Sequence, residues 1–271
     1  MQNRRDAKIP LWQGLPSSAL GLAPWGFVMS GFAVMGCAFM MTEPSVAGLV
    51  EHQLADYAPP PHTGLDIAYA DDTLLIVNKP SGLLSVPGRG ERFHDSLASR
   101  VLLEFPQALI VHRLDMQTSG LLVMALGAQA HRDLSDQFQN RQVHKRYVAL
   151  VAGLMESDSG EVALPLITDW PNRPRQKVDW TVGKPALTRW QVVARDALHG
   201  TTRVDLEPVT GRSHQLRVHM MSIGHAIVGD PLYASAVVRA QADRLLLHAA
   251  ELKLRHPRTG EWVHVVSPIP F

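Results

Sequence analysis

From Leu65 onward, short apolar runs and helical apolar patterns alternate along the chain, with turns between them. Two of the apolar runs, 66–70 and 73–78, flank Asp71 and Asp72 and predict a β-hairpin. Further runs of β type are separated by turn residues. These predicted strands cover 108–112, 120–126, 145–152, 187–194, 202–206, 245–254 and 262–266.

Apolar positions three or four residues apart predict three helices, over 95–105, 128–140 and 213–223. We expect Asp95 to cap the first helix, because a short polar side chain there accepts hydrogen bonds from free backbone N–H groups. Strands outnumber helices, and short turns join many of them. The pattern therefore predicts an α+β domain with a mixed, mainly antiparallel central sheet flanked by helices and loops.

The N-terminal part of the chain has a different texture. Residues 9–42 include no charged side chain, and the segment 20–41 has the length of a membrane span. Glycines and a proline interrupt this segment, and several methionines in it are alternative start sites. We interpret 1–55 as an extension that is disordered or results from a misassigned start, in preference to a membrane anchor, and 56–271 as the folded domain.

Composition limits the kinds of site that the chain can build. The single cysteine, Cys37, excludes a disulfide scaffold and a cysteine-rich zinc site. His112, His214 and His219 are not accompanied by acidic residues or cysteines at ligand spacing, so the sequence predicts structural or substrate-contacting histidines and no metal. It also has no phosphate loop and no dinucleotide fingerprint, and we expect no cofactor.

The net charge bears on the possible partners. Lys and Arg number 26 against 25 for Asp and Glu, a net charge of +1, which is lower than that of most nucleic-acid-binding proteins. A nucleic acid can nevertheless bind to a local basic face of a nearly neutral protein. We therefore look for clustered arginines instead of an overall positive charge.

The strongest chemical signal follows the predicted strand 108–112. Arg113 and Asp115 are two residues apart, so on a strand both would lie on one face. An arginine beside a carboxylate favours the ionised form at neutral pH, although an ordinary surface salt bridge has the same pattern. A tight turn at 118–120 then leads into the next strand.

The run 112–115 followed by 118–120 resembles the catalytic motif of the RluA-type pseudouridine synthases, which isomerise uridine to pseudouridine in RNA. Four more motifs of that family occur in the family's order, and the resemblance extends from residue 66 to the C-terminus. These further motifs are Asn78-Lys79-Pro80-Ser81-Gly82-Leu83, Lys145-Arg146-Tyr147-Val148-Ala149, the run 211–219 and Leu246-Leu247-His248-Ala249.

The resemblance implies a role for each matched residue. Asp115 matches the catalytic aspartate, which either attacks the ribose or abstracts a ribose proton. Tyr147 matches the tyrosine that packs against the target base and removes the C5 proton, and Arg212 matches the arginine paired with the aspartate. Arg113 matches the arginine that displaces the flipped nucleotide, and Leu216 matches the apolar lining of the base pocket.

Segments 84–89, 169–177 and 183–186 resemble the RluA subgroup of this family, which modifies the first nucleotide of the tRNA anticodon loop and a hairpin loop of 23S rRNA. We therefore expect dual specificity. A synthase for only one of these RNAs, or a non-catalytic RNA-binding protein with the same fold, is the alternative. Many relatives carry an S4 RNA-binding domain ahead of the catalytic domain, but residues 1–62 are nearly uncharged, so we expect no S4 domain here. We also expect a cytoplasmic monomer, and the resemblance implies a reaction that uses no cofactor or metal.

The remaining candidates for RNA contacts are basic. We expect them to lie on the same side of the domain as Asp115, although a solvated loop would explain the cluster at 173–177 equally well. These candidates are His112, Arg173, Arg175, Lys177 and Arg217.

Overall fold

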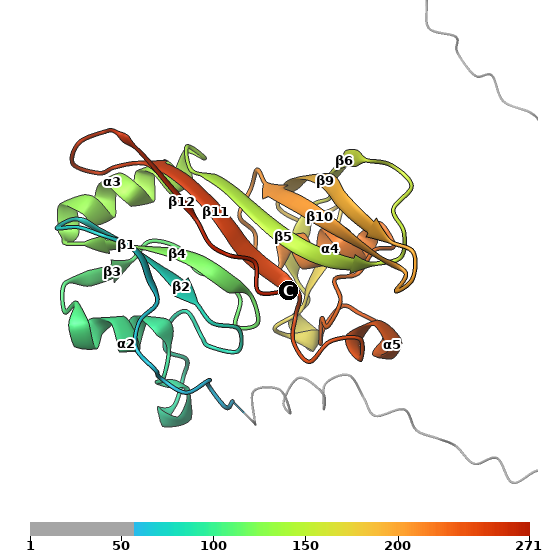
Figure 1. Cartoon of the computed structure of the whole chain (residues 1–271), viewed down its shortest axis with the longest axis horizontal. Coiled ribbons are helices and arrows are strands. Elements are labelled where there is room, and N and C mark those ends of the chain that lie inside the picture. Colours follow the sequence, from blue (N-terminus) through green and yellow to red (C-terminus); the bar gives the residue numbers. More distant parts are fainter. Residues whose placement is uncertain (1–56) are drawn as a thin grey trace, which may run out of the picture. The chain divides into compact units, whose positions relative to one another are not determined.

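The structure is a computed structural model, and it describes residues 57–271. The extension 1–55, with its apolar segment 20–41, lies outside the described residues. Residues 57–271 belong to one continuous unit (Figure 1). Among the described residues, no helix is both long enough and apolar enough to cross a membrane.

Within residues 57–271 the main element is a ten-stranded sheet with the order β1-β2-β4-β11-β5-β10-β9-β6, in which β12 pairs with β11 and β3 pairs with β4 (Figure 1). All of these pairs are antiparallel except β11 with β4, which confirms the predicted mixed, mainly antiparallel sheet. Its strands are β1 Ile67–Ala70, β2 Leu74–Lys79, β3 Ala108–Ile110, β4 Ser119–Leu126, β5 His144–Ala152, β6 Ser159–Ala163, β9 Leu187–Asp196, β10 Thr201–Pro208, β11 Leu247–Arg255 and β12 Trp262–Val266.

The three predicted helices are present, and each end lies within two residues of the predicted one. They are α2 Leu97–Glu104, α3 Ala128–Gln139 and α4 Gln215–Ser222; a short helix, α5 Ala236–Arg239, and two 3-10 turns, η1 Glu91–Phe93 and η2 Trp170–Asn172, were not predicted. A separate two-stranded sheet, β7 Leu166–Thr168 with β8 Gln176–Val178, also escaped prediction, because strands of three residues are too short to show an alternating pattern.

The predicted cap of α2 is wrong by one residue. Ser96 is the N-cap, and its hydroxyl accepts a hydrogen bond from the backbone N–H of Ser99 at 3.1 Å. Asp95 instead forms an ion pair with Arg100, whose Nε lies 2.7 Å from Oδ1. Asp95 and Ser96 are both residue types that cap helices. Because Asp95 pairs with Arg100, Ser96 takes the capping position.

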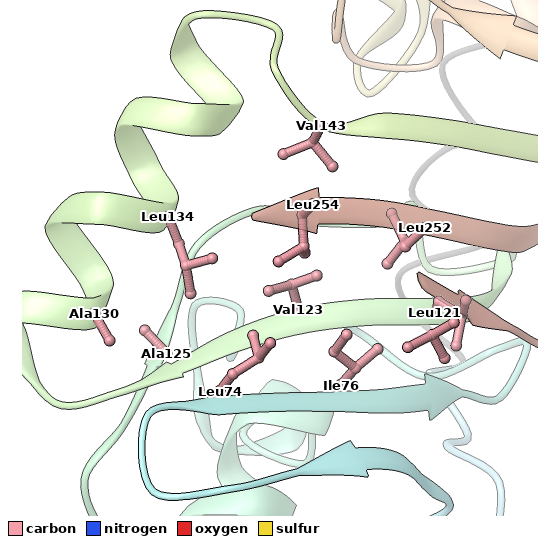
Figure 2. Packing of buried hydrophobic residues seen from close by; sticks show 11 residues of the cluster. Leu74, Ile76, Leu121, Val123, Ala125, Ala130, Leu134, Val143, Leu252 and Leu254 are labelled. Atoms are coloured by element: carbon pink, nitrogen blue, oxygen red, sulfur yellow. The ribbon is translucent and has the colours of Figure 1, made fainter. Parts of the chain in front are cut away.

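Three apolar clusters hold the helices on the sheet. On one side, Leu134 of α3 packs against Val123 of β4 and its neighbours (Figure 2). A second cluster lies beneath α2, and a third lies beneath α4. Tyr147 of β5 contacts both the second and the third cluster, so the junction between the two halves of the sheet lies at this residue. A fully buried leucine of this kind contributes about 1.5–3 kcal/mol to stability.

Candidate active site

Asp115 lies in the loop between β3 and β4. The predicted strand 108–112 ends at Ile110, so Arg113 and Asp115 are loop residues and do not share a strand face as expected. The backbone N–H of Thr118 donates to the carbonyl of Asp115 at 3.1 Å and closes a turn directly before β4. The carboxylate is therefore carried by a short, tightly turned connection and not by a strand.

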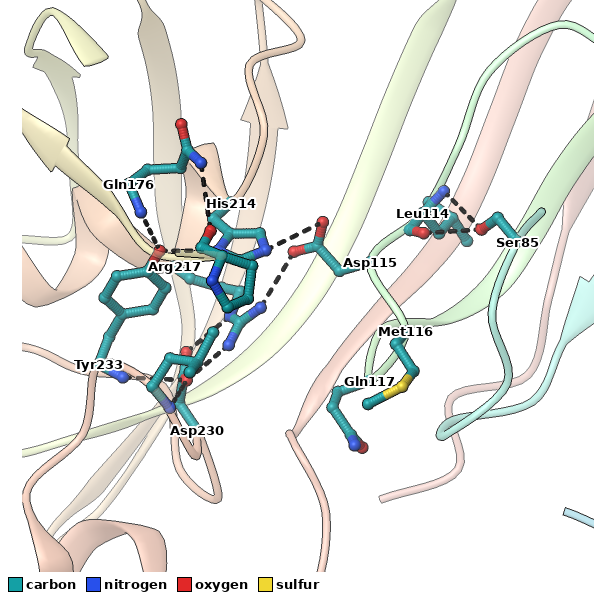
Figure 3. A network of polar contacts seen from close by, with 12 residues as sticks. Ser85, Leu114, Asp115, Met116, Gln117, Gln176, His214, Arg217, Asp230 and Tyr233 are labelled. Atoms are coloured by element: carbon teal, nitrogen blue, oxygen red, sulfur yellow. Dashed lines mark hydrogen bonds and ion pairs between the residues drawn. The ribbon is translucent and has the colours of Figure 1, made fainter. Parts of the chain in front are cut away.

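The residues on either side of Asp115 are both held in place. The Ser85 hydroxyl donates to the carbonyl of Leu114 at 2.7 Å and accepts from its N–H at 3.0 Å (Figure 3). On the other side, the carbonyl of Met116 accepts hydrogen bonds from Lys79 Nζ at 2.8 Å and from the N–H of Gly82 at 2.9 Å. The loop that contains Asp115 is thus bound to the segment 79–85 at two points.

Lys79 is the centre of this attachment. Its side chain is 1% exposed, and Nζ donates to the carbonyls of Pro80, Leu83 and Met116 at 2.7–2.8 Å. Burial lowers the pKa of Lys79 to about 7, opposed by the nearby charge of Asp115. The early sequence motif therefore has a structural role, because it fixes the loop that carries the carboxylate.

The carboxylate of Asp115 faces two side chains of the 214–217 segment. Arg217 Nη1 lies 3.2 Å from Oδ2, and His214 Nε2 lies 3.9 Å from Oδ1 (Figure 3). Arg217 also donates to both carboxylate oxygens of Asp230 at 2.8 Å. Burial raises the pKa of Asp115, but its positively charged surroundings, which include the hydrogen-bonded Arg217, outweigh this effect and hold the pKa below its usual range.

The predicted partner of Asp115, Arg212, is therefore wrong, and the partner is Arg217. Arg212 is exposed, and its Nε donates to the carbonyl of Pro185 at 3.3 Å. The two arginines occur in one motif five residues apart. Arg212 precedes α4, whereas Arg217 lies in its first turn on the buried face that contacts the Asp115 loop. Which arginine reaches the carboxylate depends on the first residue of α4, and the predicted helix began two residues before the observed one.

Tyr147 enters the site from β5, where it pairs with Ala249 of β11. Burial, and then the negative charge of Asp115, raise the pKa of Tyr147 above its usual value. The phenol therefore keeps its proton at neutral pH. Its ring lies between the two halves of the sheet, beside the carboxylate.

These residues line a cleft of about 1060 Å³. One wall is formed by loops 84–86 and 111–118, and the other by 208–217. All of the predicted site residues line this cleft except Arg175 and Lys177. Those in the cleft are Asp115, Tyr147, Arg212, Arg113, Leu216, His112, Arg173 and Arg217.

Arg175 and Lys177 contact other parts of the domain. Arg175 Nη2 donates to the carbonyl of Leu232, and its guanidinium lies 5.6 Å from the ring of Tyr233. Lys177 Nζ lies 3.8 Å from Oδ2 of Asp179. Neither side chain lines the cleft, and the expectation that both lie on the same side of the domain as Asp115 stays a prediction.

His112 and His219 are tied to the backbone or to buried hydroxyls. His112 Nε2 accepts the N–H of Val123 at 2.9 Å, its ring stacks on Phe138, and burial lowers its pKa to about 3. His219 bonds through Nδ1 to Thr188 at 2.9 Å and through Nε2 to a backbone carbonyl at 3.1 Å. In the described part of the chain, no three His, Cys, Asp or Glu side chains are grouped as metal ligands.

Sequence reasoning missed four residues that build the site: Lys79, Ser85, Asp230 and Tyr233. The first two lie in recognised motifs, but without an assigned role. Asp230 and Tyr233 follow Gly229 in a turn between apolar segments. The polar residues in this turn are the one sequence signal that would point to them. Their contribution depends on tertiary contacts that no local pattern shows.

Comparisons with known proteins agree with this geometry. The sequence model of the RNA pseudouridylate synthase family matches residues 73–222. The dual-specificity RNA pseudouridine synthase RluA of Pasteurella multocida is 51% identical over 218 residues, which are 80% of this chain and 99% of that protein. The protein of the same name from Escherichia coli is 52% identical over the same shares.

Among solved structures, human RNA pseudouridylate synthase domain containing 1 matches with a TM-score of 0.66 and 30% identity, over 79% of this chain and 87% of that one. Human RNA pseudouridylate synthase domain containing 4 matches in fold, with a TM-score of 0.60, over 83% of this chain and 92% of that one. The fold, the ordered motifs and these relatives lead to one conclusion: the chain belongs to the RNA pseudouridylate synthase family.

Proposed function

We propose that this enzyme isomerises uridine to pseudouridine at two kinds of RNA site, a tRNA anticodon loop and a 23S rRNA hairpin loop, with Asp115 as its catalytic carboxylate. The observation that carries the assignment is an ionised Asp115 between Arg217 and His214, in a cleft that also contains Tyr147. The two-substrate assignment is supported by the relatives at about half identity, whose names describe them as dual-specificity enzymes.

The isomerisation breaks the bond between uracil N1 and ribose C1′, joins C5 to the same ribose carbon, and moves the C5 proton to N1. An ionised Asp115 serves either form of the first step, as a nucleophile at the ribose or as a base that takes a ribose proton. Both require a carboxylate that is not protonated at neutral pH. The low pKa of Asp115 meets that requirement.

Tyr147 serves as the surface on which the target base packs. Because its pKa is raised, the phenol is a protonated group and a poor base. Removal of the C5 proton by Tyr147 would require that its own proton leaves first. Leu216, which lines the same cleft and packs into the cluster beneath α4, completes the apolar lining for the base.

The target nucleotide must leave its stack to reach Asp115, and a loop base costs least to extrude. A cleft of about 1060 Å³ has room for one extruded nucleotide with part of its backbone. Arg113, two residues from the carboxylate, is placed to occupy the position that the flipped base leaves. Arg173, stacked 4.6 Å from the ring of Trp170, and the exposed Arg212 are among the positive charges of the cleft that RNA phosphates can contact.

Expression of the chain in a bacterial strain that lacks its own enzyme tests this proposal. Pseudouridine should return in both the tRNA and the rRNA with the wild-type chain, and in neither RNA with Asp115→Asn. Restoration by Asp115→Asn at the wild-type level contradicts the catalytic assignment. Restoration in only one RNA by the wild-type chain contradicts dual specificity and leaves a single-substrate synthase. Monomeric state and cytoplasmic location remain predictions.

A further inference from the structure

His214 has an unusual backbone conformation beside the catalytic loop. It is the N-cap of α4, with φ 53° and ψ 17°, in the left-handed region that residues other than glycine adopt rarely. Its side chain is only 12% exposed, and Nε2 faces Oδ1 of Asp115 at 3.9 Å. Residues held in such conformations occur often at functional sites.

The other ring nitrogen of His214 has a partner that reveals the position of the ring proton. Nδ1 lies 2.7 Å from the hydroxyl oxygen of Tyr233 (Figure 3). The same oxygen accepts the backbone N–H of Gln176 at 2.8 Å, and a backbone N–H can only donate. Among residues 57–271, His214 Nδ1 is the one acceptor within reach of the Tyr233 hydroxyl proton, so that proton points to Nδ1.

We propose that Tyr233 holds His214 in the neutral tautomer with its proton on Nε2, and that this N–H donates to Oδ1 of Asp115 when RNA fills the cleft. His214 is then a positioning residue for the carboxylate. Arg217 binds one oxygen of Asp115 and His214 binds the other, so the plane of the carboxylate is fixed. The role at Asp115 rests on the proposed function, whereas the tautomer of His214 does not.

The surroundings favour a neutral donor over an imidazolium. Burial lowers the pKa of His214, and the positive charge of Arg217 adds to this effect against the opposing charges of Asp115 and Asp230. Burial likewise raises the pKa of Tyr233 to about 12, so its hydroxyl keeps the proton it donates. The distance of 3.9 Å is longer than a hydrogen bond, and catalytic hydrogen bonds commonly shorten when substrate binds.

The tautomer can be read directly by NMR. The full chain is labelled with ¹⁵N-histidine, and the His214 signals are assigned by their loss in His214→Asn. Long-range ¹H–¹⁵N spectra should show Nε2 protonated and Nδ1 unprotonated in the wild type, and a mixture of tautomers in Tyr233→Phe. A proton on Nδ1 in the wild type, a charged ring at neutral pH, or an unchanged tautomer in Tyr233→Phe overturns the inference.

Two substitutions of His214 separate donation from a purely structural role. A glutamine amide reaches the position of Nε2, whereas an asparagine amide reaches only the position of Nδ1. Asparagine, however, tolerates the left-handed backbone better. If His214 acts as a donor, His214→Gln keeps more activity than His214→Asn, although the backbone favours asparagine.

We expect kcat for an RNA hairpin to fall by roughly 10- to 100-fold in His214→Asn, the effect of losing one hydrogen bond to a charged group, and clearly less in His214→Gln. KM for the RNA should stay close to the wild-type value in both variants. If His214→Asn is as active as His214→Gln or more active, the positioning role is overturned, whereas the tautomer of His214 is not. An active Asp115→Asn enzyme would instead overturn the proposed function, so the two failures are distinguishable.

Discussion

Replacement of Arg217 by methionine should destabilise the fold strongly. The side chain of Arg217 is 3% exposed and that of its partner Asp230 is fully buried, with two hydrogen bonds of 2.8 Å between them. Methionine leaves Asp230 as a buried carboxylate that keeps only the N–H groups of Leu232 and Tyr233. Removal of one partner of a buried ion pair costs about 3–5 kcal/mol.

This loss should be visible in the melting temperature. In a domain of about 200 residues, each kcal/mol shifts Tm by about 2–4 °C, so Arg217→Met should lower Tm by about 6–20 °C. Calorimetry or circular dichroism at one protein concentration measures the shift. Activity should fall as well, because Asp115 loses its closest positive charge.

Arg212→Met is the matched control. Arg212 lies in the same motif, but its guanidinium is exposed and bonds only to a backbone carbonyl at 3.3 Å. Surface substitutions of this kind change the free energy of unfolding by about 0.5 kcal/mol or less. Equal shifts in Tm for the two methionine variants, or a larger shift for Arg212→Met, would refute the assignment of Arg217 as the buried partner of both aspartates.

Three further predictions follow from the same contacts. Gly120→Ala should lower the free energy of unfolding by about 3 kcal/mol or more in urea, because φ is 107° and a Cβ atom would lie 2.3 Å from the carbonyl oxygen of Ala249; an unchanged urea midpoint would contradict this. Lys79→Met should lower the free energy of unfolding by about 2–4 kcal/mol in the same assay, because three backbone carbonyls lose their donor. A loss of less than about 0.5 kcal/mol, as for a surface substitution, would argue against the role of Lys79 in holding the Asp115 loop. Because the folded pKa of Asp115 is lowered, the carboxylate stays ionised as pH falls, and kcat should show no loss from its protonation between about pH 8 and pH 5. In Arg217→Met this pKa rises, so the acid limb of the kcat profile should move to higher pH; coincident limbs in the two profiles would exclude Arg217 as its cause.

Much of the fold followed from local patterns. Strand β12 begins and ends at the predicted residues, and α3 differs by one residue, because β12 is rich in valine and α3 has a clear helical period. The short strands β7 and β8 have no such pattern. They pair with each other across the turn that carries Arg173 and Arg175, and three-residue strands are too short to show the pairing in the sequence.

The candidate site was predicted only where its residues lie in recognised motifs. Asp115 and Tyr147 could be assigned in this way, and both line the cleft. The choice between Arg212 and Arg217 depends on the first residue of α4, which sequence periodicity locates only to within a few residues. Asp230 acts on the site from far along the chain, through a buried ion pair that has no signal in the sequence.

The most direct test of the central claim is a single-turnover reaction with the purified chain and two RNA hairpins, a tRNA anticodon stem-loop and a 23S rRNA stem-loop. The pseudouridine formed and the affinity for RNA are measured for the wild type and for Asp115→Asn. The proposed function predicts conversion of one uridine in each hairpin by the wild type. It predicts a rate lower by roughly 10³-fold or more in Asp115→Asn with RNA binding retained. Conversion by Asp115→Asn at the wild-type rate would contradict the role of Asp115 as the catalytic carboxylate.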